Sequence, residues 1–279
     1  MVPLERSAHG SLLLHADLHL PEGTPRGTFL VAHGFLGYKD YGMMPRFAET
    51  AVRAGWAGLR FNFAHSGMSR SIDSFEYVDR FEHSTWNRQV EDLENLVEGV
   101  RDGTLHPSLP ADGPIVVLGH SRGGTTAVLA AGRGLDVQGV VSVAAPVDTL
   151  RLDSDDIERV RACGFLEVRS NRTKQNLRID RAWLDELEND PRHHAVETMA
   201  SQITCPLLVI HGDADSTIPI TDAHRIADAA PSATTVVLEG GTHVLNVDNP
   251  LAAGESSPQL DQAIASIASF LDATMASEL

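Results

Sequence analysis

The residues of this chain best suited to covalent chemistry are Gly119-His-Ser-Arg-Gly123. This pentapeptide matches the G-x-S-x-G pattern, in which a tight strand-to-helix turn presents a serine hydroxyl as a nucleophile. Glycines are required in such a turn because Cβ atoms would clash where backbone segments nearly touch. The serine also lies at a helix N-terminus, where free N–H groups stabilise negative charge. The sequence therefore predicts that Ser121 is a catalytic nucleophile.

A serine nucleophile needs a base to accept its proton. Of the thirteen histidines, His243 follows the last predicted strand in a glycine-rich loop, from which it can reach inward. We predict that His243 is the general base. Three other histidines also lie at strand ends, directly before turns, and we expect them to be hydrogen-bonded supports: His33, His120 and His211.

The base in turn needs a carboxylate that orients it. Three aspartates follow predicted strands and compete for this role: Asp215, Asp213 and Asp148. We favour Asp215. Asp213 could instead form a turn by bonding its own backbone, and Asp148 could cap a helix. The sequence leaves these alternatives open.

Two backbone N–H groups are predicted to bind the oxyanion that forms during acyl transfer. One belongs to Arg122, next to the nucleophile, and the other to Phe35, in the loop after an early strand. In other enzymes, removing one such donor costs about 2.7–4 kcal/mol. Because both donors are backbone groups, replacing the side chain of Phe35 is expected to leave its donor in place.

The elements that carry these residues alternate along the chain. Strands are predicted near residues 11–20, 28–32, 56–63, 114–118, 137–144, 205–211 and 234–238. Helices are predicted at residues 44–54, after Ser84 or Thr85, after the nucleophile, at 220–229 and at 260–271. This alternation predicts an α/β fold with a mostly parallel, doubly wound sheet. Ligands bind such sheets at the carboxyl ends of the strands, which is where the candidate residues lie.

Residues 146–203 depart from the alternating pattern. They are highly charged, have few features of strands, and predict two or three short helices. Within them, residues 161–181 are locally basic, with Arg161, Arg169, Arg172, Lys174, Arg178 and Arg181 against Glu167 and Asp180. These cations could bind a carboxylate or phosphate on the substrate. They could equally solvate the outer face of the segment or pair with acidic surface groups, and both readings stay open.

Composition limits the classes of partner. The formal net charge is −16, which argues against nucleic acid, since phosphate binding needs a basic face. Two cysteines, Cys163 and Cys205, form no disulfide framework and are expected to be reduced. The N-terminus resembles no signal peptide, and no stretch approaches the roughly 20 apolar residues of a membrane span. We expect a cytoplasmic protein with a small-molecule substrate and an oligomeric state that the sequence does not determine.

Neither a metal nor a cofactor is expected. The only adjacent histidine pair is His193-His194, and the spacings of known zinc sites are absent. No G-x-G-x-x-G motif lies at a strand–helix junction, so no nucleotide cofactor is indicated.

Taken together, these motifs resemble the α/β-hydrolase superfamily over residues 10–275, including its order of Ser, Asp and His. Within it, His33-Gly-Phe-Leu-Gly37 and Arg60-Phe-Asn-Phe63 resemble small serine esterases of the cinnamoyl/feruloyl esterase and dienelactone-hydrolase-like groups. The resemblance implies a single domain over residues 1–279, with about eight strands and a helical lid at 147–203, after strand six.

We therefore expect a carboxylic ester hydrolase that works through an acyl-enzyme, with Ser121, His243 and Asp215 as its triad. A thioesterase, an acyltransferase, an amidase or a carbon–carbon bond hydrolase could use the same groups. A non-catalytic binding protein on this fold is the alternative from another class. Arg122 stands where cinnamoyl esterases commonly carry glutamine, so their substrate preference is not implied.

Overall fold

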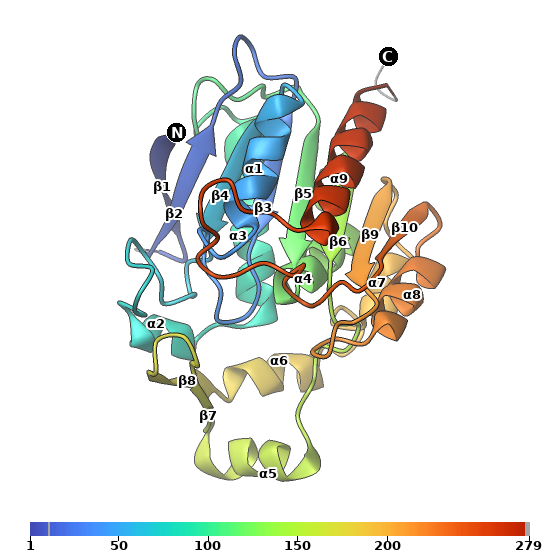
Figure 1. Cartoon of the computed structure of the whole chain (residues 1–279). Helices are drawn as coiled ribbons and strands as arrows, with labels where there is room; N and C mark the ends of the chain where they lie inside the picture. The colour runs from blue at the N-terminus through green and yellow to red at the C-terminus, as the bar shows by residue number, and fades with distance from the viewer. Residues whose placement is uncertain (11, 277–279) are drawn as a thin grey trace.

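Eight strands form the central sheet of the computed structural model, which describes residues 1–10 and 12–276 (Figure 1). Ser11, where the first predicted strand begins, and residues 277–279 of the expected domain lie outside the described residues. The strand order is β1-β2-β4-β3-β5-β6-β9-β10. Strand β2 is antiparallel to both β1 and β4, and every other pair is parallel. The predicted fold class is confirmed.

The strands of this sheet have the following bounds: β1 Val2–Ala8, β2 Leu12–His19, β3 Thr28–Ala32, β4 Ala57–Asn62, β5 Ile115–His120, β6 Gly139–Val143, β9 Leu207–Gly212 and β10 Ala233–Leu238. The predicted strands lie within a few residues of seven of them. Strand β1 was not predicted. Most of its residues are exposed or half-buried, because it pairs only with β2 at the edge of the sheet, so it has no continuous apolar run.

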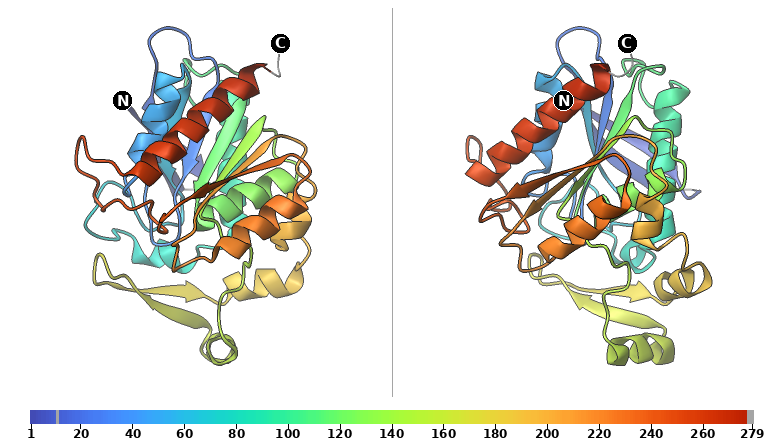
Figure 2. Two further views of the ribbon diagram at one scale, coloured as in Figure 1. Left: turned by 45° about the vertical axis from the view of Figure 1, so that its right-hand side comes forward. Right: turned by 90° about the vertical axis from the view of Figure 1, so that its right-hand side faces the viewer.

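Helices cover both faces of the sheet (Figure 2). Helices α1 (Met44–Arg53) and α9 (Pro258–Ala276) pack on one face, and α3 (Trp86–Arg101), α4 (Arg122–Gly132) and α8 (Ile220–Ala229) pack on the other. Strand β3 is buried throughout because its alternate residues serve both cores. Phe29 and Val31 face α1 and α9, and Leu30 and Ala32 face the opposite core. This two-sided burial explains the continuous apolar run.

The chain between β6 and β9 builds a separate layer across the carboxyl ends of the strands (Figure 1). The layer contains α5 (Ser154–Cys163), β7 (Phe165–Arg169), β8 (Asn176–Asp180) and α6 (Ala182–Asn189). Helix α7 (Val196–Ala200), which follows in the chain, packs instead against α4 and α8 of the body. We call residues 147–203 the insert. Its three short helices agree with the sequence prediction. The antiparallel hairpin β7–β8 was missed, because only two of its ten strand residues are buried and the usual alternation is weak.

Several polar contacts fasten the outer part of the insert to the body of the protein, and two of them use Glu186 and Gln175. The carboxylate of Glu186, on α6, accepts hydrogen bonds from the backbone N–H groups of Trp86 and Asn87 at the start of α3. In the second contact, the side chain of Gln175 accepts from the N–H of Phe75 at 2.7 Å and donates to its carbonyl oxygen at 3.0 Å. Phe75 lies before the short helix α2 (Val78–Glu82). The hairpin and α6 are thus held by these polar contacts and by buried apolar side chains such as Ile179 and Leu184, not by pairing with the central sheet.

Among residues 1–10 and 12–276, no helix combines the length and the apolar character needed to cross a membrane.

Candidate active site

Ser121 sits in a strained turn between β5 and α4. Its backbone has φ 53° and ψ −125°, a conformation that costs an L-residue free energy and persists only where the surroundings enforce it. Two hydrogen bonds do so. The N–H of Ser121 donates to the carbonyl of Val143 on β6 at 2.8 Å, and its own carbonyl accepts from the N–H of Gly124 at 2.8 Å. The turn therefore holds the hydroxyl beyond the end of the sheet.

The flanking glycines are required by close contacts between backbones. A Cβ atom on Gly119 would lie 2.0 Å from the carbonyl oxygen of Gly123. One on Gly123 would lie 2.5 Å from the carbonyl oxygen of His33. Neither oxygen can move without displacing a strand end or a helix end. These close contacts explain why the motif has glycine at both positions.

A chain of hydrogen bonds joins Ser121, His243 and Asp215. His243 Nε2 lies 3.0 Å from Ser121 Oγ, and His243 Nδ1 lies 2.8 Å from Asp215 Oδ2. A carboxylate can only accept, so Nδ1 carries the proton and Nε2 is free to accept from the serine. Ser121 follows β5, Asp215 follows β9, and His243 follows β10. The structure therefore brings together the three residues predicted as nucleophile, base and acid, and this is the arrangement of a catalytic triad.

The carboxylate of Asp215 is buried and held ionised. Burial alone would raise the pKa of Asp215, but hydrogen bonds from His211, His243 and the N–H of Ile218 outweigh it, so the pKa lies below its usual range. The N–H groups of Thr217 and Ile218 donate to Oδ1 at 2.8 and 2.9 Å. A fixed negative charge next to His243 stabilises the imidazolium that would form when the serine gives up its proton.

The competing aspartates do not reach His243. Asp213 accepts a hydrogen bond from the N–H of Gly240 at 2.7 Å. Asp148 is largely exposed and lies 3.6 Å from Arg225. Neither alternative role is observed. Asp213 bonds a loop 27 residues away rather than its own backbone, and Asp148 caps no helix, since the N-cap of α5 is Asp153.

The three supporting histidines bond to the backbone around the site. His120 Nε2 donates to the carbonyl oxygen of His243 at 2.8 Å, and burial lowers the pKa of His120 to about 3, helped by the charge of His243. His33 Nδ1 donates to the carbonyl of Gly34 at 2.8 Å, and burial lowers its pKa to about 4. His211 Nε2 donates to the carbonyl of Ile218 at 3.0 Å. Because His120 and His33 stay neutral at physiological pH, they hold the loops without adding charge.

The predicted oxyanion donors lie on either side of the nucleophile. Arg122 begins α4 immediately after Ser121. The loop that carries Phe35 passes close by, since a Cβ atom on Gly34 would lie 3.0 Å from Ser121 Cβ. Within residues 1–10 and 12–276, the N–H groups of Phe35 and Arg122 have no protein acceptor. Both donors are therefore available to a substrate oxygen.

Charged side chains anchor the loop that carries Phe35. Lys39 Nζ lies 2.6 Å from Asp17 on β2 and 2.7 Å from Asp40 in the same loop. Arg60, on β4, binds both aspartates and lies 2.9 Å from Asp17. All four groups are buried or half-buried, where ion pairs are only weakly screened. The network ties the loop to two strands of the sheet.

The sequence analysis missed Asn249, which connects the loops of the donor and the base. It lies in the loop after His243, and its side-chain oxygen accepts from Tyr38 Oη at 3.0 Å and from the N–H of Gly42 at 2.9 Å. Tyr38 and Gly42 belong to the loop that carries Phe35. No motif contains Asn249, and its partners are more than 200 residues away, so nothing local in the sequence identified it.

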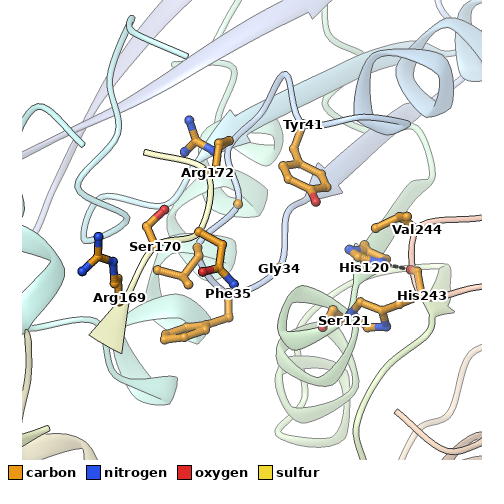
Figure 3. Close-up of a pocket in the computed structure, with 13 residues that line it drawn as sticks. Gly34, Phe35, Tyr41, His120, Ser121, Arg169, Ser170, Arg172, His243 and Val244 are labelled. Atoms are coloured by element: carbon orange, nitrogen blue, oxygen red, sulfur yellow. Dashed lines mark hydrogen bonds between the residues drawn. The ribbon is translucent and has the colours of Figure 1, made fainter. Parts of the chain in front are cut away.

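Two cavities meet at Ser121 and Phe35. The first, of about 220 Å³, we call the histidine-side cavity. It is lined by His243, Val244, Tyr41 and the turn of the hairpin, as Figure 3 shows. The second, of about 360 Å³, we call the insert-side cavity. Its wall is mainly apolar and includes Trp86, Leu152, Leu166, Val168, Ile179 and Trp183. A substrate placed at Ser121 can thus extend in two directions.

The side chain of Arg122 is buried beneath the insert-side cavity. Its Nε donates to Gln89 Oε1 at 3.1 Å and Nη2 donates to the carbonyl of Ser84 at 3.0 Å. The guanidinium also lies 4.5 Å from the ring of Trp86. Burial lowers the pKa of Arg122 to about 10, although Glu186 opposes this, so the group remains charged. It links the turn at Ser121 to α3.

Comparisons with known proteins place this architecture among recognised folds. A family model described as the alpha/beta hydrolase family matches residues 29–253. The chain is 27% identical to a monoacylglycerol lipase of Mycolicibacterium smegmatis over 266 residues, covering 83% of this chain and 87% of the lipase. It is 23% identical to the human mitochondrial palmitoyl-protein thioesterase ABHD10 over 202 residues, covering 70% and 59% of the two chains. The solved structure of Est1E from Butyrivibrio proteoclasticus with ferulic acid bound superposes with a TM-score of 0.72 at 20% identity, over 98% of this chain and 99% of that chain.

Proposed function

The chain belongs to the alpha/beta hydrolase family, and we propose that it is a serine hydrolase that cleaves carboxylic esters of small substrates. The observation that carries the proposal is the continuous hydrogen-bond chain from Asp215 through His243 to Ser121, with distances of 2.8 and 3.0 Å. Membership of the family confirms the resemblance inferred from the motifs. The relative named a monoacylglycerol lipase supports ester chemistry.

The proposed reaction has two halves. Ser121 Oγ attacks the acyl carbon while His243 Nε2 takes the serine proton, and the oxyanion is bound by the N–H groups of Phe35 and Arg122. His243 then gives this proton to the leaving oxygen, the ester C–O bond breaks, and an acyl-enzyme remains. Water attacks the acyl-enzyme with His243 again as base. The acid is released, and the proton returns to Ser121.

We further propose that the whole chain is one hydrolase domain in which the insert serves as a lid. The insert crosses the carboxyl ends of the strands (Figure 1), where ligands bind in this class of sheet. Leu166, Val168 and Trp183 of the insert line the cavity beside Ser121. Its residues are therefore in a position to contact substrate.

A fluorophosphonate probe, which labels activated serines, tests the proposal. Wild-type protein should be labelled and should hydrolyse 4-nitrophenyl butanoate, whereas Ser121→Ala should do neither. Unlabelled wild type would overturn the proposal and favour a non-catalytic binding protein. Labelling of Ser121→Ala equal to that of wild type would also overturn it, because the reactive serine would then be another residue. Circular dichroism of the variant separates lost chemistry from lost folding.

A thioesterase is the second candidate, because a relative carries the name palmitoyl-protein thioesterase and the same triad can attack a thioester. Matched oxygen and thiol esters of one acyl group distinguish the two. A kcat/KM for the thioester that exceeds that for the oxygen ester by more than the intrinsic difference in their reactivity would favour the thioesterase.

A further inference from the structure

The two cavities that meet at Ser121 differ in their access to the base. His243 and His120 line the histidine-side cavity, and neither lines the insert-side cavity. Ser121 and Phe35, which belong to the proposed attack and oxyanion binding, line both. If the proposed function holds, a substrate must place its acyl carbon at the junction of the two cavities.

The position of His243 decides which end of the substrate enters which cavity. The leaving oxygen must come within hydrogen-bonding distance of His243 Nε2 to receive the proton when the C–O bond breaks. The leaving group therefore extends into the histidine-side cavity. The acyl group then occupies the insert-side cavity, where Trp86, Leu166 and Trp183 supply an apolar wall that favours hydrocarbon over charge.

The wall of the histidine-side cavity carries positive charge. Its lining includes two arginines, Arg169 and Arg172, and no acidic residue. Both arginines come from the hairpin and lie across the cavity from Ser121 and His243 (Figure 3). This is unusual for a chain whose formal net charge is −16. A leaving group that crosses the cavity ends near these two cations.

These two arginines differ from the other arginines of the hairpin region. Arg161 pairs with Glu188, Arg178 with Glu167 at 3.4 Å, and Arg181 with Asp185 at 2.8 Å. By contrast, no carboxylate of the described residues forms an ion pair with Arg169 or Arg172. The arginines away from the cavity are thus paired with carboxylates. Beside the cavity no carboxylate is within ion-pair distance, although Asp73 acts on Arg172 from farther away.

Arg172 is fixed in place and Arg169 is exposed. The guanidinium of Arg172 donates to the carbonyl of Ile72 and lies 4.6 Å from the ring of Tyr38. Burial lowers the pKa of Arg172, and Tyr38, Tyr41 and Asp73 oppose this shift, so the group remains charged at neutral pH. Arg169, at the end of β7, is exposed to solvent and has a long side chain that can follow a ligand. Arg172 therefore supplies a positive charge at a fixed position, and Arg169 supplies one whose side chain can adjust to the ligand.

The charged groups of the insert-side cavity are already engaged. Arg122 is hydrogen bonded to Gln89 and Ser84. Arg151 donates to the carbonyl of Thr217 at 3.1 Å and lies 3.5 Å from Asp222. Asp148 lies 3.6 Å from Arg225. The cations of this cavity are therefore either buried and hydrogen bonded, as Arg122 is, or paired with a carboxylate, as Arg151 is.

We infer that the substrate joins an apolar acyl group, bound in the insert-side cavity, to a leaving group bearing a carboxylate or phosphate, which Arg169 and Arg172 recognise. The two arginines act on binding of the leaving group rather than on the bond-breaking step. This inference rests on the proposed serine hydrolase, whose acyl-enzyme chemistry it leaves unchanged.

Five esters of hexanoic and adipic acid test the inference. The first three are hexanoyl esters of 4-hydroxybenzoate, 4-hydroxybenzamide and 4-hydroxyphenyl phosphate, which differ in the charge on the leaving group. The fourth, monophenyl adipate, carries its charge on the acyl side and is compared with phenyl hexanoate. The measured quantity is the ratio of kcat/KM for each anionic ester to that for its neutral counterpart. Comparing variants by this ratio removes differences in intrinsic reactivity.

Arg169→Gln and Arg172→Gln should each lower the ratio for the benzoate and benzamide pair by about three- to fivefold, the size expected for an exposed ion pair. The loss should appear in KM and should shrink as salt is added. Arg172→Lys keeps the charge and should retain most of the ratio. Arg178→Gln is the matched control, because Arg178 lies on the same hairpin but lines neither cavity, and its ratio should equal that of wild type. Comparison of kcat/KM ratios for the benzoate ester and the phosphate ester, each relative to the benzamide ester, shows which anion is preferred.

Two results would overturn the inference. One is an unchanged benzoate-to-benzamide ratio in both glutamine variants, with the neutral ester hydrolysed normally by wild type; the proposed function would then stand. The other is hydrolysis of monophenyl adipate as efficiently as phenyl hexanoate, which would place charge in the insert-side cavity. If wild type hydrolyses none of the esters and Ser121 is not labelled, the proposed function fails and this inference fails with it.

Discussion

The turn at Ser121 and the hairpin of the insert form opposite walls of one site, but the chain holds them by different means. Around Ser121, backbone packs directly on backbone, and every residue of β5 and β6 is buried. In the hairpin only Leu177 and Ile179 of the strand residues are buried, and side-chain hydrogen bonds attach it to the body. The wall around Ser121 carries the residues proposed as catalytic, and we call it the catalytic wall. It is therefore specified by close packing of backbone, whereas the hairpin is specified by a few buried side chains and by side-chain hydrogen bonds. Such a division allows specificity to change while the chemistry is kept.

The largest effect should come from changing the acid on the catalytic wall. In Asp215→Asn, the Nδ1–H of His243 loses its charged acceptor, the histidine can adopt the wrong tautomer, and kcat should fall by about 10⁴-fold. Steady-state hydrolysis of 4-nitrophenyl butanoate measures this loss. Asp148→Asn and Asp213→Asn are the controls and should retain most of the activity. A large loss in Asp148→Asn with normal turnover in Asp215→Asn would move the acid to the insert side.

A pair of glycine substitutions compares the packing of the two walls. Gly119→Ala places a Cβ atom 2.0 Å from the carbonyl oxygen of Gly123 and should cost about 3 kcal/mol or more in the free energy of unfolding. Gly164 ends α5 in the insert with φ 83°, and a Cβ atom there would meet nothing within 4 Å. Gly164→Ala should therefore cost only about 1–2 kcal/mol, from the left-handed backbone alone. Urea denaturation measures both, and equal losses would contradict the contrast.

The free energy of unfolding, measured as a function of pH, should show the contribution of the Asp215 carboxylate. The pKa of Asp215 is lower in the folded protein than in the unfolded chain, so Asp215 stabilises the fold above its unfolded pKa, near 3.9. This contribution is lost as the pH falls further toward the folded pKa. It is on the order of 2 kcal/mol for a carboxylate of this kind. The difference in unfolding free energy between wild type and Asp215→Asn should shrink as the pH falls from 6 to 3. A constant difference would contradict the depressed pKa.

The smallest effect should come from loosening the insert. Glu186→Gln keeps the shape of the side chain but removes the charge that binds the N-terminus of α3. It should lower stability by about 1 kcal/mol, seen as a decrease of a few degrees in the melting temperature. We expect KM to rise more than kcat falls, because the insert lines both cavities but contributes none of the residues proposed as the triad. A kcat loss comparable with that of Asp215→Asn would show that the two walls are not independent.

The sequence alone was sufficient to locate Ser121, His243 and Asp215 at the ends of predicted strands. Ser121, His243 and Asp215 each follow an apolar strand, and strands buried on both faces must be continuous apolar runs, so their ends are easy to locate. The local turn at Ser121 also imposes glycines that are visible as a motif. Strand β1 and the hairpin β7–β8 escaped prediction because they are edge or exposed elements, in which few positions are buried and the pattern carries little information.

Only the tertiary structure decided which aspartate meets His243 and which arginines face the cavity. Asp213 and Asp215 are two residues apart on one loop, and the direction of each side chain depends on contacts with Gly240, Thr217 and Ile218. Arg169 and Arg178 look alike in sequence, but Glu167 neutralises only Arg178. Motifs record constraints from neighbours along the chain, whereas pairing and burial are set by residues that are distant in sequence. For this protein, the residues proposed for catalysis are therefore recognisable from short stretches of sequence. The shape and charge of the two cavities beside Ser121 depend on how the insert folds over the sheet.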